Sequence, residues 1–374
     1  MKSLRGSKAW FVSLLLVLAM VAAACGGDDD EGTDAGSGDD GDGAATQETV
    51  SLTMSMSTCS PYYYGYHIAE ALGFFEEEGI DLKQECSSGS SEVASILAAG
   101  TADLGAAGFS AMLPAMAASD NVNPFFVHTY GEPYDILVLA DSGIDEVADL
   151  EGKTMGVSDL AGGEMPLVRA LISNAGLVPE EDVQFLEVSE NPGTVQVAFE
   201  RDDIVAYASG VSTTSIFPAT GIDTVSILPE FVGDLAAGGL MATEEWKDNV
   251  DVLARVGRAA AKGHLVGFAN HDAAICVMKD VIPAEFEDEE AGRASFEGSL
   301  LATTAPENDD GTYDFGRGVA DVDQWNEYIN IYFEAGVLDE AFDPSPYLVD
   351  VKDEINNFDQ QEIIDMANEL PTDC

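Results

Sequence analysis

Basic residues are scarce in this sequence. It has 374 residues, with 15 lysines and arginines against 69 aspartates and glutamates, and its formal net charge is −54 at pH 7. Proteins that bind nucleic acids contact the phosphates through clustered lysines and arginines, so nucleic acid is excluded as a partner. The acidic residues are spread along the whole chain, which indicates a solvated acidic surface rather than one acidic binding patch. We interpret this surface as an adaptation to a salty environment, where ions screen the repulsion between carboxylates.

The usual motifs of metal and catalytic sites are also lacking. The sequence has no Cys-x-x-Cys pair, and its four histidines do not cluster with cysteines: His67, His128, His264 and His271. A zinc site is therefore not expected. Neither a Ser-His-Asp order nor a phosphate-binding loop is present. We expect no metal, no cofactor and no catalytic residue, and we interpret His67 as a residue on a helix face.

The apolar run at the N-terminus is too short to cross a membrane. Three basic residues within the first eight positions precede the run Trp10–Ala24, and Cys25 follows three alanines. This pattern is typical of a secretory signal peptide, which we assign to residues 1–24. The segment resembles the bacterial lipobox, and the resemblance implies that Cys25 is lipidated and anchors the protein to the cell membrane from outside. An ordinary signal peptide with an incidental cysteine is the alternative.

The segment after the signal peptide contains no large apolar residue. Residues 25–46 are mainly Gly, Asp, Ser, Thr and Ala, so we expect a disordered acidic linker. The chain beyond them is long and hydrophobic enough for one large or two medium domains. Outside the cytosol its four cysteines are candidates for disulfides. Because Cys59 and Cys86 end neighbouring predicted strands, we favour the pair Cys59–Cys86, which leaves Cys276–Cys374.

Strands and helices alternate in the first part of this body. Apolar and hydroxyl residues alternate in the first strand, and glycines follow the helices, as they do at left-handed helix ends. The expected strands are Thr49–Ser57, Ile80–Gln84 and Asp103–Gly108, and the helices between and after them begin at Pro61, Ser90 and Ser110. A βαβαβ unit of this kind needs a parallel sheet, and ligands bind at the carboxyl ends of such strands.

The same pattern restarts at Lys153. The second unit has expected strands at Lys153–Ser158, Val183–Val188 and Ile204–Ser209, with helices at Glu164–Asn174 and Thr194–Glu200. Further expected strands are Pro124–Tyr130, Asp135–Ala140, Thr224–Leu228 and Gly239–Thr243, and further expected helices are Val250–Asn270, Ala273–Val281, Val322–Ala335, Tyr347–Phe358 and Glu362–Leu370. We predict an α/β protein of two lobes, with the first formed by residues 47–138 plus 239–374 and the second, inserted lobe formed by residues 139–238.

Three stretches carry a resemblance to a known group of proteins. They are HIAEALGFFEEEGIDL at His67–Leu82, SSEVASILAAGTADLGAAG at Ser90–Gly108 and ILVLADSGIDEVADLEGKTMGV at Ile136–Val157. In this order and spacing they resemble the solute-binding proteins of ABC importers, in particular the nitrate/sulfonate/taurine and thiamine-pyrimidine-precursor group. The resemblance is good over Thr49–Leu177 and loose afterwards.

This resemblance implies a fold and a role. The fold is the two-lobed type II periplasmic-binding-protein fold, in which each lobe is a mostly parallel sheet flanked by helices and the lobes close on a ligand about a hinge. Asp135–Ala140 and Leu240–Thr243 are then the crossover strands. The role is that of a monomeric, extracytoplasmic protein that is not an enzyme, captures a small solute and delivers it to a membrane permease.

Loops that follow the strands are the expected ligand-binding positions. From the first lobe we predict Ser60, Tyr62, Tyr63, Tyr64, Ser88, Gly89, Ser90, Phe109 and Ser110, and from the second Ser158, Ala161, Gly162, Gly163, Glu164, Ser209, Gly210 and Ser212. Tyr62, Tyr63 and Tyr64 cannot all face one way on a helix, so at most two reach the ligand. Helix capping alone is an alternative explanation for the serines after Cys86.

None of these loops contains lysine or arginine, which disfavours sulfonate, nitrate or phosphate unless backbone N–H groups suffice. Tyrosines and hydroxyls suit a flat, neutral or weakly cationic heterocycle, and a pyrimidine precursor of thiamine is our first choice. Two alternatives remain: an anion-binding protein of the sulfonate, taurine or nitrate type, and an enzyme similar to the pyrimidine-precursor synthases. Arg169 is expected on a solvated helix face.

Overall fold

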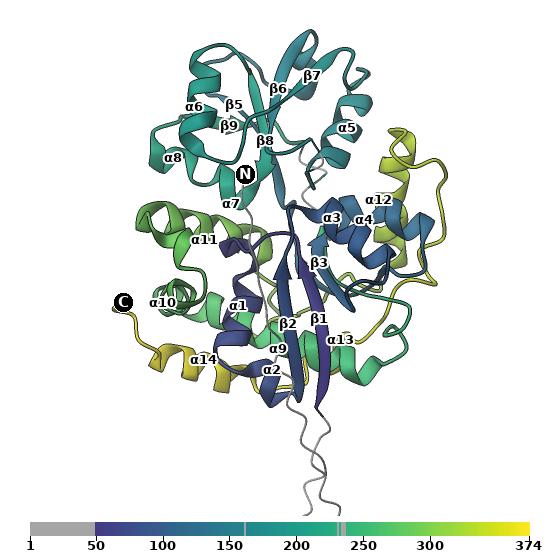
Figure 1. Cartoon of the computed structure of the whole chain (residues 1–374), viewed down its shortest axis with the longest axis vertical. Coiled ribbons are helices and arrows are strands. Elements are labelled where there is room, and N and C mark those ends of the chain that lie inside the picture. Colours follow the sequence, from purple (N-terminus) through teal and green to yellow (C-terminus); the bar gives the residue numbers. More distant parts are fainter. Residues whose placement is uncertain (1–48, 161, 230–231, 233–236) are drawn as a thin grey trace, which may run out of the picture. The chain divides into compact units, whose positions relative to one another are not determined.

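The computed structural model describes residues 49–160, 162–229, 232 and 237–374. The predicted signal peptide, the lipidated Cys25, the linker and Ala161 therefore lie outside the described residues. The described part belongs to one unit, Gln47–Cys374, which contains two sheets of five strands each (Figure 1).

The first sheet is mixed, with the strand order β2-β1-β3-β10-β4. Its strands are β1 (Val50–Met56), β2 (Ile80–Cys86), β3 (Leu104–Gly108), β4 (Asn123–Thr129) and β10 (Gly238–Ala242). β1 pairs in parallel with β2 and β3, whereas β10 lies antiparallel between β3 and β4. The carboxyl ends of the three parallel strands consequently lie at one edge of the sheet.

The second sheet repeats this arrangement, with the order β7-β6-β8-β5-β9. Its strands are β5 (Tyr134–Leu139), β6 (Lys153–Val157), β7 (Val183–Glu187), β8 (Ala206–Gly210) and β9 (Thr224–Ser226). β6 pairs in parallel with β7 and β8, and β5 lies antiparallel to β8. The chain changes sheet between β4 and β5 and returns between β9 and β10. The lobe boundaries at residues 138 and 238 stay predictions.

Helices and short helical turns surround the two sheets (Figure 1). Those that follow the strands are η1 (Pro61–Tyr63), α1 (Tyr64–Ala71), α2 (Phe74–Glu77), α3 (Ser90–Ala98), α4 (Phe109–Ala118), η2 (Val147–Leu150), α5 (Met165–Asn174), α6 (Pro192–Glu200), α7 (Val211–Thr214) and α8 (Phe217–Thr220). The C-terminal part adds α9 (Val250–Ala269), α10 (His271–Val281), η4 (Pro283–Phe286), α11 (Glu289–Thr303), α12 (Val322–Glu334), α13 (Lys352–Ile355) and α14 (Gln360–Glu369).

Helices α1 and α9 pack together at a glycine. A Cβ atom placed on Gly263 would lie 2.0 Å from the carbonyl oxygen of Gly65, so only glycine permits this approach. The imidazole of His264 fills the space beside Gly65, and the side chains of His264 and His67 are both buried. His67 lies on a face of helix α1, as we interpreted it from the sequence, and this face is buried in the protein.

The helices of the structure differ from the expected ones in two places: one helix was missed and one expected helix is wrong. The long helix α11 was not expected, because its buried face consists largely of small residues such as Gly292, Ser295 and Ser299, which give a weak apolar periodicity. The expected helix Tyr347–Phe358 is reduced to the single turn α13. Before it the chain is not helical: Val349 N–H donates to the carbonyl of Pro124, 2.9 Å away, and Val351 is buried.

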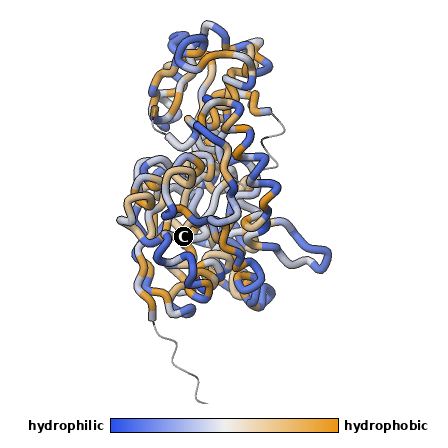
Figure 2. The backbone as a smooth tube through the Cα atoms, turned by 90° about the vertical axis from the view of Figure 1, so that its right-hand side faces the viewer, coloured by the Kyte–Doolittle hydropathy of each residue, from blue (hydrophilic) through white to orange (hydrophobic). Residues whose placement is uncertain are grey.

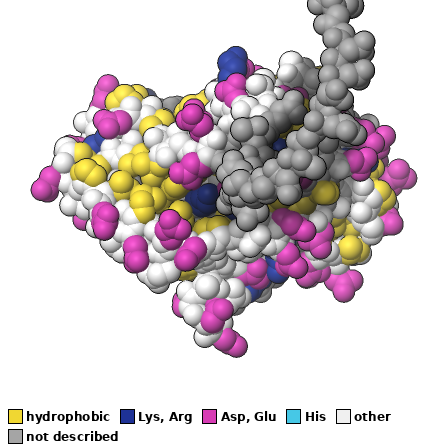
Figure 3. Space-filling view, turned by 90° about the horizontal axis from the view of Figure 1, so that it is seen from below, with side chains coloured by type: hydrophobic (Ala, Val, Ile, Leu, Met, Phe, Trp, Pro, Cys, Tyr) yellow, Lys and Arg dark blue, Asp and Glu magenta, His cyan; other side chains and the backbone are white. Residues whose placement is uncertain are grey.

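The surface is acidic and the hydrophobic residues are dispersed along the chain. Asp and Glu side chains are scattered over the face seen in Figure 3, with few lysines and arginines among them. Figure 2 shows hydrophobic and hydrophilic residues interspersed along the chain. Among the described helices, none has the length and apolar character to cross a membrane.

Candidate functional site

A cavity of about 500 Å³ lies where strand ends of the two sheets approach each other. Its walls are the loops after β1, β2 and β3 on one side and those after β6, β7 and β8 on the other, together with the start of β5. The lining residues are Ser57, Thr58, Tyr62, Tyr63, Ser87, Ser88, Gly89, Ser90, Gly108, Pro133, Tyr134, Ser158, Asp159, Gly162, Gly163, Glu164, Ser189, Glu190, Gly210 and Ser212. This is the position at which open α/β sheets bind ligands.

A short 3-10 helix sets the direction of the three consecutive tyrosines. Ser60 begins η1 by accepting a hydrogen bond from Tyr62 N–H at 3.4 Å, and Pro61 occupies the first turn, where no N–H is needed. Tyr62 and Tyr63 line the cavity, and the hydroxyl of Tyr62 is hydrogen-bonded to Thr129 Oγ1 at 2.6 Å.

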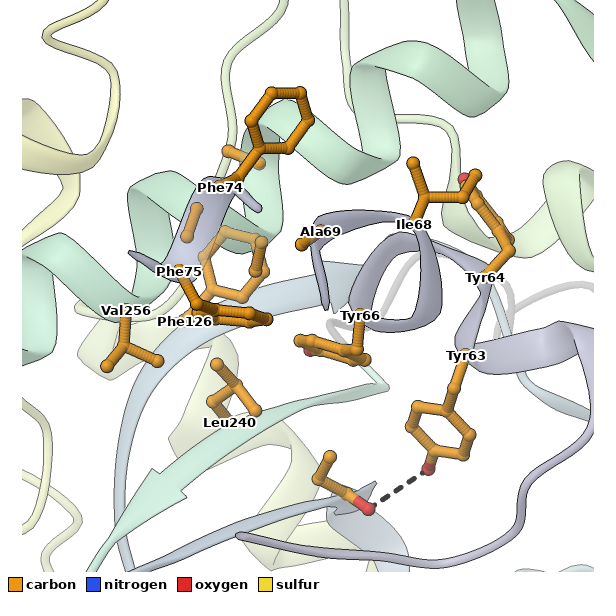
Figure 4. Packing of buried hydrophobic residues seen from close by; sticks show 14 of the residues in the cluster. Tyr63, Tyr64, Tyr66, Ile68, Ala69, Phe74, Phe75, Phe126, Leu240 and Val256 are labelled. Atoms are coloured by element: carbon orange, nitrogen blue, oxygen red, sulfur yellow. Dashed lines mark hydrogen bonds between the residues drawn. The ribbon is translucent and has the colours of Figure 1, made fainter. Parts of the chain in front are cut away.

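Tyr63 and Tyr64 point in opposite directions (Figure 4). The hydroxyl of Tyr63 donates to the carbonyl of Ala106 at 3.1 Å, beside the sheet. Tyr64 is fully buried, with its ring against His264 and its hydroxyl 3.0 Å from Thr303 Oγ1. Tyr64 is thus part of the core and lies outside the cavity wall.

Tyr134 crosses from the second sheet to the first. Its hydroxyl is 3.1 Å from Ser90 Oγ, which also accepts a hydrogen bond from Gly108 N–H at 3.1 Å. Cβ atoms on Gly108 and Gly163 would lie 2.7 and 2.1 Å from this hydroxyl, so a side chain at either position would have to displace Tyr134. Ser110 Oγ donates to the carbonyl of Gly163 at 3.2 Å and adds a second link between the two walls.

The second wall carries the charged groups. Glu164 is only 3% exposed, and its Oε1 accepts hydrogen bonds from Ser158 Oγ at 2.5 Å and Ser158 N–H at 3.2 Å. Burial raises the pKa of Glu164 and the negative charge of Glu190 adds to this, whereas the Ser158 hydroxyl opposes it. Glu190 is an exposed residue. The groups around it nevertheless exclude part of the surrounding water, and this desolvation raises its pKa.

The described lining residues carry no positive charge. Neither lysine nor arginine is among those that line the cavity in the described part of the chain. Arg169, the basic residue on the neighbouring helix α5, is half-exposed and pairs with Glu180 at 2.9 Å, on a solvated face as expected. The carboxylates among the described lining residues are those of Asp159, Glu164 and Glu190, so this wall of the cavity is acidic.

Most of the predicted binding residues meet at this cavity. The predicted residues outside its wall are Ser60, Tyr64, Phe109, Ser110 and Ser209. Phe109 is buried against Trp325 with 4.7 Å between ring centroids, Ser209 is fully buried within β8, and Ser110 lies behind the wall, where it holds Gly163.

Sequence reasoning missed several lining residues. Ser57, Thr58, Ser189 and Glu190 follow β1 and β7 directly, so the rule that ligand loops follow strands could have found them. This rule could not have found Tyr134, because Tyr134 begins a strand instead of following one.

One of the two disulfides lies beside the cavity. The structure pairs Cys59 with Cys86 and Cys276 with Cys374, each with 5.5 Å between Cα atoms. The first pair joins the two loops that carry Thr58 and Ser87 into the cavity wall. Within the described ranges, no three His, Cys, Asp or Glu side chains are arranged to hold a metal ion.

Known proteins resemble this chain in sequence and in fold. Proteins of Brucella abortus and Brucella suis, named as candidate binding proteins, are 31% identical over 140 residues, which is 37% of this chain and 41% of theirs. The matched stretch thus spans less than half the length of these curated relatives.

Solved structures match over a larger part of the chain. The periplasmic aliphatic sulphonate-binding protein of Escherichia coli matches with a TM-score of 0.60 at 14% identity, covering 80% of this chain and 91% of its own. A Candida albicans protein described as having the generic periplasmic binding protein fold matches with a TM-score of 0.55 at 16% identity, covering 79% and 93%. The periplasmic nitrate-binding protein of Synechocystis matches with a TM-score of 0.54 at 11% identity, covering 87% and 91%.

These matches confirm the two-sheet α/β fold expected from the sequence. The sequence profile described as "NMT1/THI5 like" matches residues 60–274, which is more than half of the chain. This chain belongs to the NMT1/THI5-like family and has the fold of the periplasmic binding proteins.

Proposed function

We propose that this protein is the extracytoplasmic solute-binding component of an ABC importer. The family, the fold and the cavity between the two sheets support this role. In the proposed cycle the two lobes close on a small organic solute, and the closed form delivers it to a membrane permease. A lipid on Cys25 would hold the protein at the membrane during this cycle.

We propose a flat, neutral or cationic heterocycle as the ligand, such as a pyrimidine precursor of thiamine. One observation carries this choice: the described residues of the cavity wall combine the carboxylates of Glu164 and Glu190 with hydroxyls and tyrosines, and neither lysine nor arginine is among them. A buried carboxylate binds a protonated or N–H-rich ring through charge-assisted hydrogen bonds, and tyrosines supply flat contact area. The proposed contacts of the ligand are the flat rings of Tyr62 and Tyr134 and a hydrogen bond to the carboxylate of Glu164.

An anionic ligand is the weaker candidate, although two of the structural neighbours are named for sulphonate and nitrate. The backbone N–H groups at Gly162 and Met165, at the entry to α5, are already used, since they donate to the carbonyls of Asp159 and Gly162. The carboxylate of Glu164 would moreover lie beside a bound anion and repel it.

A thermal-shift panel on the mature protein tests this proposal. The panel contains a 4-amino-5-hydroxymethylpyrimidine, taurine and nitrate, each added at rising concentration in high salt. We expect the pyrimidine to raise Tm by several degrees at saturation, because a ligand that binds only the folded state stabilises it. Stabilisation by taurine or nitrate alone would overturn the ligand class, and turnover of the pyrimidine would overturn the non-enzymatic role.

A further inference from the structure

The segment that joins the two sheets contains a buried carboxyl group without a partner. Glu132 lies between β4 and β5 and is 7% exposed, and among the described residues neither of its carboxylate oxygens has a hydrogen-bond partner. The N–H of Tyr134 comes near enough to lower the pKa of Glu132 but lacks the geometry of a hydrogen bond. The following residue, Pro133, has no N–H to offer.

The rest of this segment is firmly bonded. The N–H groups of Tyr130 and Gly131 donate to the carbonyl of Ala302 at the end of α11, at 2.8 and 3.2 Å. The carbonyl of Pro133 accepts a hydrogen bond from Val211 N–H at 2.9 Å. The carboxyl of Glu132 is therefore not required to hold the segment in place, and its burial needs another explanation.

The surroundings of Glu132 come from several elements and are all acidic or neutral. Its electrostatic neighbours are Tyr62 of η1, Tyr134 and Asp135 of β5, and Tyr328 and Tyr332 of α12. The hydroxyls of Tyr328 and Tyr332 are buried, and each tyrosine is an electrostatic neighbour of the other. No cation is among these neighbours, and burial raises the pKa of Glu132 from 4.5 to about 8.

We propose that Glu132 couples closure of the cleft to the uptake of one proton. This inference rests on the proposed function, because it assumes that the two lobes open and close about this segment. With the two walls in contact, as they are through Ser90–Tyr134 and Ser110–Gly163, an ionised Glu132 would be an unpaired charge among buried rings. When the lobes part, water reaches the segment and the carboxyl ionises as an ordinary glutamate does.

The sign of the coupling follows from linkage. The group is an acid whose pKa is higher in the closed form than in water, so it favours closure fully below its ordinary pKa of 4.5. This contribution is lost as the pH rises toward about 8, the raised pKa. Within that window the closure equilibrium weakens by up to about tenfold per pH unit, since one proton is involved.

Small-angle X-ray scattering on the ligand-free mature protein tests the inference. The radius of gyration is measured from pH 5.5 to 9 in high salt for the wild type, for Glu132→Gln and for Asp141→Asn. We expect the wild type to expand as the pH rises and Glu132→Gln, which mimics the protonated acid, to stay compact throughout. Asp141→Asn is the control, because Asp141 follows β5 and is exposed, so this variant should follow the wild type.

The outcomes separate this inference from the proposed function. A wild-type radius that does not change with pH, or a Glu132→Gln variant that expands like the wild type, overturns the proton coupling. The wild-type curve alone decides the matter if the variant does not fold. Because no ligand is added, failure of the thermal-shift panel leaves this measurement intact, and failure of the scattering experiment leaves the solute-binding role intact.

Discussion

The two walls of the cavity differ in charge and in how they are fixed. The described residues of the wall from the first sheet are hydroxyl residues, glycines and two tyrosines, with no charged group among them, and the disulfide Cys59–Cys86 joins two of its loops. The wall from the second sheet holds all three carboxylates, and the Ser158 hydroxyl fixes the innermost of them, Glu164. The two walls therefore differ in what they offer a ligand: the first wall gives the cavity its shape, and the second gives it its charge.

Removing the two disulfides in turn tests how the first wall is fixed and should give the largest effects. The two cysteines are 98 positions apart in the sequence for Cys276–Cys374 and 27 positions apart for Cys59–Cys86. Loop entropy gives costs of about 4.7 and 3.6 kcal/mol in the free energy of unfolding for the two serine double variants. Denaturant unfolding measures these costs, and calorimetry measures ligand affinity.

Only the loss of Cys59–Cys86 should also weaken ligand binding, because only this pair joins loops of the cavity wall. The Cys276→Ser/Cys374→Ser variant is the control, and it should bind as the wild type does at temperatures where it remains folded. Equal affinity in both double variants would show that the disulfide does not help to fix the first wall.

Gly163→Ala tests the contact between the two walls. The new Cβ would meet the hydroxyl of Tyr134 at 2.1 Å, so we expect a loss of about 1–3 kcal/mol in stability from overpacking and weaker ligand binding. Gly210→Ala is the matched control, since it also lines the cavity but its nearest neighbour would be 3.7 Å away. Similar effects of both changes on Tm and affinity would contradict the close approach of Tyr134.

Glu164→Gln tests the charge of the second wall. If the ligand is a cation, the variant should lose about 1.5–3 kcal/mol of binding free energy, the value of a charge-assisted hydrogen bond. Wild-type affinity should fall as the pH drops through the pKa of Glu164, which burial raises, and therefore at a higher pH than for an exposed glutamate. For the solvent-exposed Glu190 we expect a smaller effect of Glu190→Gln. Calorimetry from pH 5 to 8 would contradict the assignment if Glu164→Gln bound the pyrimidine unchanged.

Tyr62→Phe should have the smallest effect and separates shape from hydrogen bonding in the first wall. Tyr62 lines the cavity and its hydroxyl is bonded to Thr129, so removal of this hydroxyl should cost about 1 kcal/mol in stability and reduce affinity slightly. Tyr64→Phe removes a similar buried bond, to Thr303, and should lower stability alone. A loss of affinity in Tyr64→Phe would place the ligand where the structure has packed core.

Much of the fold could be predicted from the sequence, because its parallel strands and the helices between them have strong local signals. Pro61 and Gly100 mark helix boundaries as expected, and Gly100 adopts the left-handed conformation with φ of 64°. Helix α11 escaped prediction because it buries small residues, and such residues look alike in helices, turns and loops.

The candidate site was harder to predict than the fold. The loops were foreseeable from topology, but side-chain directions were not. Tyr62 and Tyr63 belong to a 3-10 turn and Tyr64 begins an α-helix, so no single periodicity describes the three. Glu132 could not be recognised either, because burial in a connecting segment depends on α12, which is nearly 200 residues away in the sequence.

The position of β10 has a consequence for the order in which the protein folds. β10 lies between β3 and β4, so the first sheet cannot be completed until the whole of the second sheet has been synthesised. The second sheet is built from one continuous stretch, from β5 to β9, and can pair without the C-terminal part. Until β10 arrives, β3 and β4 each have an unpaired edge, and exposed strand edges favour aggregation. The many carboxylates of this chain keep such incomplete molecules apart through their mutual repulsion, so the acidity that shapes the folded surface also protects the unfinished fold.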